Sequence, residues 1–422
     1  MLQVAEKCLT ANQVVPGPES IFLKVIRARA TLALMLIQRL VKVNLQAPVV
    51  YKLLSTVVGT IYGIEEPFTS ESIGYYRTLL KTLFVTLRAY QTSKDPGKEN
   101  GDSEAGLHAS VEVTQLVLNI LDRIVGRGFR ALVSLVHEGD SPTHPEDLAL
   151  FTAILQACLN IPTIEQSQVQ ILNIMASHDC IHAATSLYSW ADKLSIQGDP
   201  VWGELSVLFL LELSALPLLA EHMASDGVLS NLLTANLTKY MLKSNISPDA
   251  ESLTSQRCYG IWAKGLLPIM LNFLTALGGT VGIEVAYVLN QFKHLLRSSV
   301  DRFEAPGASR TQTRTTPHLI TLIATSEINS LALLTRILSS LRQSTNTEIA
   351  NVDWDAAAVL ENVEFWLSSE ILLKERLLPL GPREQEWRNM KSGGAEDNLL
   401  EAKVRSQLEA VREVLSEEVD DD

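Results

Sequence analysis

Cysteine is scarce in this sequence: the 422 residues hold four, Cys8, Cys158, Cys180 and Cys258. No two of them form a CxxC pair, and all four stand apart along the chain. Such sparse thiols argue against a disulfide framework and for a reducing compartment, where buried cysteines act as small apolar side chains. The first residues also lack a basic region followed by an apolar core, so we expect no secretory signal.

Positive charge is in deficit as well. The chain has 35 Lys and Arg against 48 Asp and Glu, which gives a net charge of −13. A phosphate backbone would be repelled overall, so the balance argues against nucleic-acid binding. An acidic surface instead favours basic protein partners.

The common catalytic motifs are missing, since GxSxG, HExxH and the P-loop pattern do not occur. The stretch GRGFRA at 126–131 matches the GxGxxA form of a dinucleotide-binding loop. The residues before it have a helical pattern, whereas that loop must follow a strand. We therefore interpret 126–131 as a turn between two helices.

One possible metal site is also excluded, because it offers too few ligands. His178 and His182 are four residues apart, so on a helix they would share one face, while Cys180 would point away. Two ligands are too few for a zinc site. We expect Ser177 to cap a helix here, and we predict no enzyme activity, no cofactor and no metal: no catalytic, cofactor-binding or metal residue is named.

The chain is instead rich in apolar residues at three- and four-residue spacing, which is typical of amphipathic helices. Residues 317–342 predict one such helix, with Thr316 and Pro317 at its start. Pro145 followed by Glu146 and Asp147 indicates another start. The apolar stripe of 317–342 consists of Ile320, Ala324, Ile328, Leu331, Leu334, Leu338 and Leu341.

Residues 75–90 follow the same rule. Their apolar face consists of Tyr76, Leu80, Leu83 and Leu87, and a neighbouring row of Arg77, Lys81 and Arg88 is expected to stay in solvent. We count roughly fifteen helices of this kind and no convincing pair of strands.

The longest charge-free run, residues 265–283, raises the question of a membrane span, since a spanning helix needs about 20 apolar residues. Gly278 and Gly279 divide the run, so we expect one helix ending near Leu277 and another starting near Thr280. The second continues as an amphipathic stripe, which suits a protein core and not lipid. We predict that Leu274 and Phe292 are buried and that the chain does not span a membrane. The stripe consists of Val281, Val285, Val288, Phe292 and Leu296.

This pattern predicts an all-α fold, an irregular HEAT/ARM-like α-solenoid of stacked helices, because a single core stops growing at about 250–300 residues. We expect the solenoid over 1–390, with disordered loops near 94–106 and 304–317. Residues 391–422 are expected to form a linker, a last helix and an acidic tail.

Three stretches carry a family resemblance: GYYRTLLKTLFVTLRAYQ at 74–91, CYGIWAKGLLPIMLNFLTALGG at 258–279 and ENVEFWLSSEILLKERLLPLGPREQEW at 361–387. With the acidic helical body, they resemble the C-terminal region of large fungal scaffold nucleoporins of the one-eighty-eight class, paralogues of the one-ninety-two class. The resemblance implies a curved α-solenoid in the inner ring of the nuclear pore complex, at the nuclear envelope of the nucleus. It further implies a scaffold that binds linear segments of other nucleoporins and supports nucleocytoplasmic transport of protein and mRNA, with transport receptors as further partners.

The alternative is a soluble karyopherin-like or HEAT-type transport adaptor. Importin-α-type solenoids hold peptides with a ladder of Trp and Asn four residues apart, and no tryptophan here has Asn at that position. The absence of any Phe-Gly dipeptide excludes an FG-repeat protein of the pore barrier.

Overall fold

The computed structural model describes residues 1–13, 20–41, 46–93, 104–139, 142–243, 246–305, 319–344, 348–391 and 398–419. The chain divides into two compact units, unit 1 over Met1–Leu187 and unit 2 over Tyr188–Asp422. Both are built from helices, and within the described ranges the only β-pairing is three isolated bridges. The all-α prediction is therefore confirmed.

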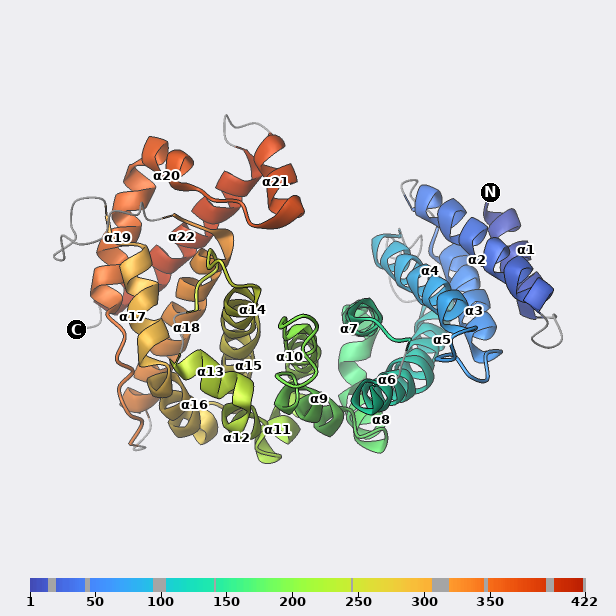
Figure 1. The fold of residues 1–422 in the computed structure, drawn as a ribbon, viewed down its shortest axis with the longest axis horizontal. Helices are drawn as coiled ribbons and strands as arrows, with labels where there is room; N and C mark the ends of the chain where they lie inside the picture. The colour runs from blue at the N-terminus through green and yellow to red at the C-terminus, as the bar shows by residue number, and fades with distance from the viewer. Residues whose placement is uncertain are drawn as a thin grey trace. The chain divides into compact units, whose positions relative to one another are not determined.

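Unit 1 opens with two consecutive helix pairs (Figure 1), in which α1 packs on α2, α3 on α4, and α2 on α4. A long helix with a π segment in its middle follows, then shorter helices that pack against it. The elements are α1 (Leu2–Gln13), α2 (Ser20–Leu40), α3 (Ala47–Tyr62), α4 (Ile73–Thr92), α5 (Glu104–Ile120), η1 (Leu121–Gly126), α6 (Arg127–Glu138), α7 (Pro145–Leu159), η2 (Pro162–Ser167), α8 (Gln168–Ser177) and α9 (Cys180–Ser189), whose end lies in unit 2.

Unit 2 repeats the theme of a long helix interrupted by a π segment, here packed against α10, α11 and α18. The last helix, which we expected beyond a linker, packs on α18 and α19 within this unit. The elements are α10 (Val201–Ser214), α11 (Pro217–Ser225), α12 (Val228–Thr234), α13 (Asn236–Lys243), α14 (Leu253–Ile261), η3 (Trp262–Leu266), α15 (Leu267–Leu277), α16 (Gly279–Gln291), α17 (Lys293–Arg302), α18 (Leu322–Ser344), α19 (Ala356–Ser368), α20 (Glu370–Arg376), α21 (Gly381–Asn389) and α22 (Leu399–Val419).

The charge-free run behaves as predicted. It separates into α15, which ends at Leu277, and α16, which starts at Gly279, with Gly278 at a φ of +55° between them. Leu274 and Phe292 are both buried. The continuous helix Leu253–Leu277 is long and apolar enough to cross a membrane by composition, but 61% of its most apolar window is buried inside the protein, as in the core helix of a soluble fold.

Three details of the helices differ from expectation. The stripe that runs from Val281 to Leu296 is shared by two helices, because the backbone breaks at Phe292 between α16 and α17. The helix expected from 317 starts at Leu322, where the Thr321 hydroxyl accepts a hydrogen bond from the Ala324 amide. The described residues contain 22 α-helices instead of roughly fifteen, since helices of seven to ten residues give weak periodicity.

The loop predictions fall mostly outside the described residues. Residues 94–103 and 306–318 are not described. The second range includes Thr316 and Pro317, the expected start of a helix. Helix α5 begins at Glu104, within the last residues of the first expected loop.

The apolar stripe of α4 is buried as predicted, and Lys81 and Arg88 are exposed. Arg77 does not stay in solvent. Its guanidinium donates two hydrogen bonds, of 2.6 and 2.8 Å, to the buried carboxylate of Asp147 at the start of α7. Asp147 also accepts from the His144 amide at 2.9 Å, so the acid expected to start this helix also joins it to α4.

The interpretation of 126–131 as a turn was wrong. The chain continues helically from α5 through η1 into α6, and the two glycines serve close packing. A Cβ at Gly128 would lie 2.7 Å from the Phe151 ring, and one at Gly126 would lie 2.6 Å from the His178 ring.

Three of the four cysteines, Cys158, Cys180 and Cys258, are buried and free, and Cys8 is half-buried. Burial raises the pKa of all three buried thiols, that of Cys180 to about 12. They therefore pack as small apolar groups, as the sequence predicts.

Candidate functional site

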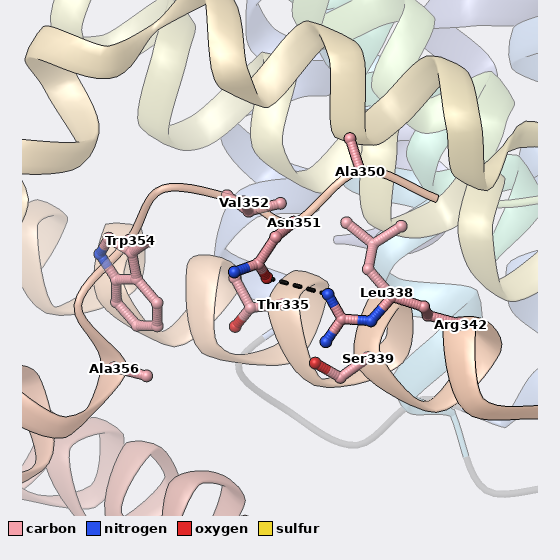
Figure 2. Close-up of a pocket in the computed structure, with 9 residues that line it drawn as sticks. All are labelled: Thr335, Leu338, Ser339, Arg342, Ala350, Asn351, Val352, Trp354 and Ala356. Atoms are coloured by element: carbon pink, nitrogen blue, oxygen red, sulfur yellow. Dashed lines mark hydrogen bonds between the residues drawn. The ribbon is translucent and has the colours of Figure 1, made fainter. Parts of the chain in front are cut away.

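A non-helical stretch of unit 2 lies along α18 and fills part of a groove there. We call residues 348–355, which lead into α19, the strap. Figure 2 shows the strap passing beside α18, where the Arg342 guanidinium donates a hydrogen bond of 3.2 Å to the side-chain oxygen of Asn351. The protein therefore already holds one stretch of non-helical chain on a helical surface.

Apolar side chains anchor the strap. Ile349, Val352 and Trp354 are all buried, although the strap residues between them face solvent. The Ile349 side chain lies so close to α16 that a Cβ on Gly282 would be 2.8 Å from its end, so any larger residue there would displace that side chain. The Trp354 indole N–H donates to the Ser299 hydroxyl at 3.0 Å, which satisfies the one polar atom of that buried ring.

The backbone of the strap is held by one amide side chain on α16. The Asn290 Nδ2 donates to the Asn351 carbonyl at 2.9 Å, and the Asn290 Oδ1 accepts from the Asp353 amide at 3.1 Å. Because both bonds go to main-chain groups, they do not depend on the side chains of the segment that is bound. Main-chain hydrogen bonds combined with pockets for side chains are a general means of holding a linear segment.

The space left beside the strap is small. The cavity has about 120 Å³ and is lined by residues of α18, the strap and the first residue of α19. Pockets that hold cofactors or drug-sized ligands measure about 300–1,000 Å³. Arg342 is the one ionisable residue among those that line it, so the lining pairs no nucleophile with a base. This arrangement suits the binding of a polypeptide segment better than catalysis.

Nearer the start of α18, unit 2 contains a buried ionic cluster that sequence reasoning missed. The fully buried Glu327 of α18 accepts hydrogen bonds from the Tyr259 hydroxyl, from the Trp262 indole at 2.7 Å and from the Arg302 guanidinium at 3.1 Å. Arg302 also lies over the Tyr259 ring, 4.5 Å from its centre. One carboxylate thus joins α14, η3, α17 and α18.

Burial raises the pKa of Glu327, and the Arg302 charge with the two aromatic donors offsets part of this rise. Burial also raises the pKa of Tyr259 well above its ordinary value. Because the carboxylate has a donor on both oxygens and the cation of Arg302, whose side chain is 15% exposed, beside it, the cluster acts as a fixed structural core. In sequence its members stand up to 68 residues apart, so no local motif marks it.

The structure also places the residues of the rejected metal motif. Ser177 ends α8 and donates to the Ile174 carbonyl at 2.8 Å, so it does not cap the following helix as expected. His178 and Asp179 form the bend between α8 and α9, and His182 is exposed on α9. The His178 ring pairs with Asp122 of η1 at 2.7 Å.

The two histidines therefore do not share a helix face. No group of three or more His, Cys, Asp or Glu that could hold a metal ion exists among the described residues. The absence of a metal or cofactor in the whole chain stays a prediction.

Stacked amphipathic helices that bury their shared faces and present a groove for non-helical chain define an α-helical solenoid of the HEAT/ARM-like class. Comparison with known proteins gives the family within this class. The family model described as "Nuclear pore protein NUP188 C-terminal domain" matches residues 53–415. The chain belongs to this family of nucleoporins.

Individual relatives agree with this assignment. The nucleoporin NUP188 of Chaetomium thermophilum is 49% identical over 98% of this chain, and nup184 of Schizosaccharomyces pombe is 25% identical over 53% of it. The solved structure "Nup188(aa1445-1827) from Myceliophthora thermophila" superposes with a TM-score of 0.76 at 52% identity, covering 87% of this chain and 98% of that one. The chain spans 24% of the length of the Chaetomium relative and 13% of the Schizosaccharomyces relative.

Proposed function

We propose that this chain is a non-catalytic scaffold segment of the nuclear pore complex, located in the inner ring at the nuclear envelope. In this role it binds linear segments of other nucleoporins and supports nucleocytoplasmic transport. Family membership supports the setting. The observation that carries the binding role is the strap, a non-helical segment held by buried apolar anchors and by the main-chain clamp of Asn290.

Binding by such grooves relies on many weak contacts. A disordered partner loses conformational entropy when it becomes ordered, so affinity must be gathered over a long surface. A solenoid offers that surface between successive helices. The net charge of −13 favours basic linker segments by long-range attraction, so association should weaken as salt concentration rises.

The test separates a scaffold from a carrier. The immobilised chain is incubated with nuclear-envelope extract, with and without the GTP-bound small GTPase of nuclear transport, and the bound proteins are identified. We expect other nucleoporins, bound equally in both conditions. Capture of transport cargo that the GTPase releases would instead establish the karyopherin-like adaptor.

A second measurement concerns residence. Fluorescence recovery of the full-length parent protein at the nuclear rim should be slow, because a scaffold exchanges rarely. Recovery within seconds would contradict the scaffold role.

A further inference from the structure

A second cleft in unit 2 lies where the ends of α20 and α21 meet the first turn of α22 (Figure 1). Its volume of about 490 Å³ falls in the range of about 300–1,000 Å³ that is usual for ligand sites, unlike the small space beside the strap. The two sites share no lining residue. The cleft is therefore a separate candidate for binding.

Positive charge gathers in this cleft, although the protein as a whole is acidic. Three cations, Lys374, Arg388 and Lys391, line it against one carboxylate, that of Glu401. In the whole chain, 35 basic residues stand against 48 acidic ones. We call the three cationic side chains the basic corner.

Two of these cations are available to a ligand. Glu401 is 1% exposed and pairs with Lys374 at 3.3 Å, so the only carboxylate of the lining is already matched. Arg388 and Lys391 are exposed, and neither forms a hydrogen bond or an ion pair within the part of the chain that the structure describes. An anion in the cleft would therefore meet two cations that have no counter-charge.

The backbone that carries these two cations is held in place. The Leu399 amide at the start of α22 donates to the Met390 carbonyl at 2.8 Å. The Lys403 ammonium of α22 also lies 4.8 Å from the centre of the Trp387 ring on α21. A site that is ordered before binding loses less entropy when its ligand arrives.

Exposed apolar side chains border the basic corner. Met390 lines the cleft and is 53% exposed, and Ile371, one turn before Lys374 on α20, is 75% exposed. A polypeptide with acidic and apolar residues side by side complements both features. Nucleic acid fits less well, because its phosphate backbone offers no apolar contact and is repelled by a net charge of −13.

We infer that the basic corner binds an acidic linear segment of a partner protein. Asp or Glu side chains of the segment pair with Arg388 and Lys391, and a neighbouring apolar side chain contacts Met390. Clusters of basic side chains recognise acidic motifs in this way in other proteins. At physiological ionic strength charges act over only about 8 Å, so the local cations decide the attraction and not the distant acidic surface. The inference is independent of the proposed function, because the strap groove is a different surface.

The experiment selects the ligand without assuming its sequence. A phage-displayed library of random dodecapeptides is selected on the immobilised 422-residue chain, and in parallel on Arg388→Gln/Lys391→Gln. The matched control is Lys293→Gln/Arg297→Gln, which removes one Lys and one Arg from exposed positions of α17. Because all four side chains are exposed, both variants should unfold at the urea midpoint of the wild type.

Peptides selected on the wild type and on the control should be enriched in Asp and Glu over the starting library, and this enrichment should be absent with Arg388→Gln/Lys391→Gln. The most enriched peptide, measured by fluorescence anisotropy, should bind that variant at least about fivefold more weakly than the wild type, since two ion pairs are lost. Its affinity for the wild type should also fall as salt concentration rises.

Selected peptides without an excess of Asp and Glu would overturn the inference. So would equal binding of the enriched peptide to the wild type and to Arg388→Gln/Lys391→Gln, or an equal loss in the control variant. Displacement of the peptide by equimolar inorganic pyrophosphate would overturn it as well, because that result would assign the basic corner to a phosphate ligand.

Discussion

Truncation of Phe292 to alanine tests how tightly the core of unit 2 is packed at the junction of α16 and α17. The ring is 1% exposed, and its centre lies 4.5 Å from the Trp262 ring, tilted by 36°. A buried aromatic side chain removes about 150–250 Å² from water, which at ~25 cal/mol per Å² amounts to about 4–6 kcal/mol as an upper bound. Measured Phe→Ala losses of about 3–5 kcal/mol fall at the lower side of this range.

Tryptophan fluorescence reports the unfolding of unit 2 alone, because all six tryptophans lie in Tyr188–Asp422. With a urea slope of about 3 kcal/mol per M, a loss of about 3–5 kcal/mol should lower the unfolding midpoint by about 1–1.7 M. Tyr287→Ala on α16 is the control, since that side chain is 60% exposed and its removal should cost less than about 0.5 kcal/mol. A loss of less than about 0.5 kcal/mol for Phe292→Ala would show that the ring does not pack as described.

Three further outcomes are expected. Glu327→Ala should destabilise unit 2 by about 3–5 kcal/mol in the same urea assay, because it leaves the largely buried Arg302, whose side chain is 15% exposed, without its carboxylate, and a loss within error would refute the cluster. Gly265→Ala should cost about 1–3 kcal/mol, since its Cβ would lie 2.3 Å from a neighbouring side chain, whereas Gly74→Ala in open space should be neutral or stabilising. In native protein a thiol reagent should modify Cys8 well before the three buried cysteines, whose raised pKa values keep them as thiols, and all four should react together only after unfolding.

The sequence predicted those features of the fold that neighbouring residues determine. Pro145 with two following acids determines the start of α7, and glycines 278 and 279 divide the charge-free run where expected. The apolar stripes identify buried positions correctly, except for the half-buried Leu341, because burial on a helix follows its period. The all-α class follows from these local signals, and the solenoid follows from the number of such helices in a chain of 422 residues.

Features that depend on distant residues could not be predicted. Arg77 has the spacing of a solvated face, and only its partner Asp147, 70 residues away, draws it inward. The break at Phe292 leaves the apolar stripe unchanged, so periodicity cannot detect it. The strap lacks any regular pattern, and the groove beneath it is formed by elements that meet only in the folded unit.

The two π segments, η1 and η3, give these long helices an unusual tolerance of length change. An ordinary helix that gains one residue turns everything beyond it by about 100°, which would move the apolar stripe of α6 or α15 out of the core. A π segment absorbs one extra residue in a wider turn and leaves the faces on either side in register. Deleting one residue within Leu121–Gly126 or Trp262–Leu266 should therefore convert the segment to ordinary helix and keep the downstream packing, so either place can lose a single residue without changing the fold.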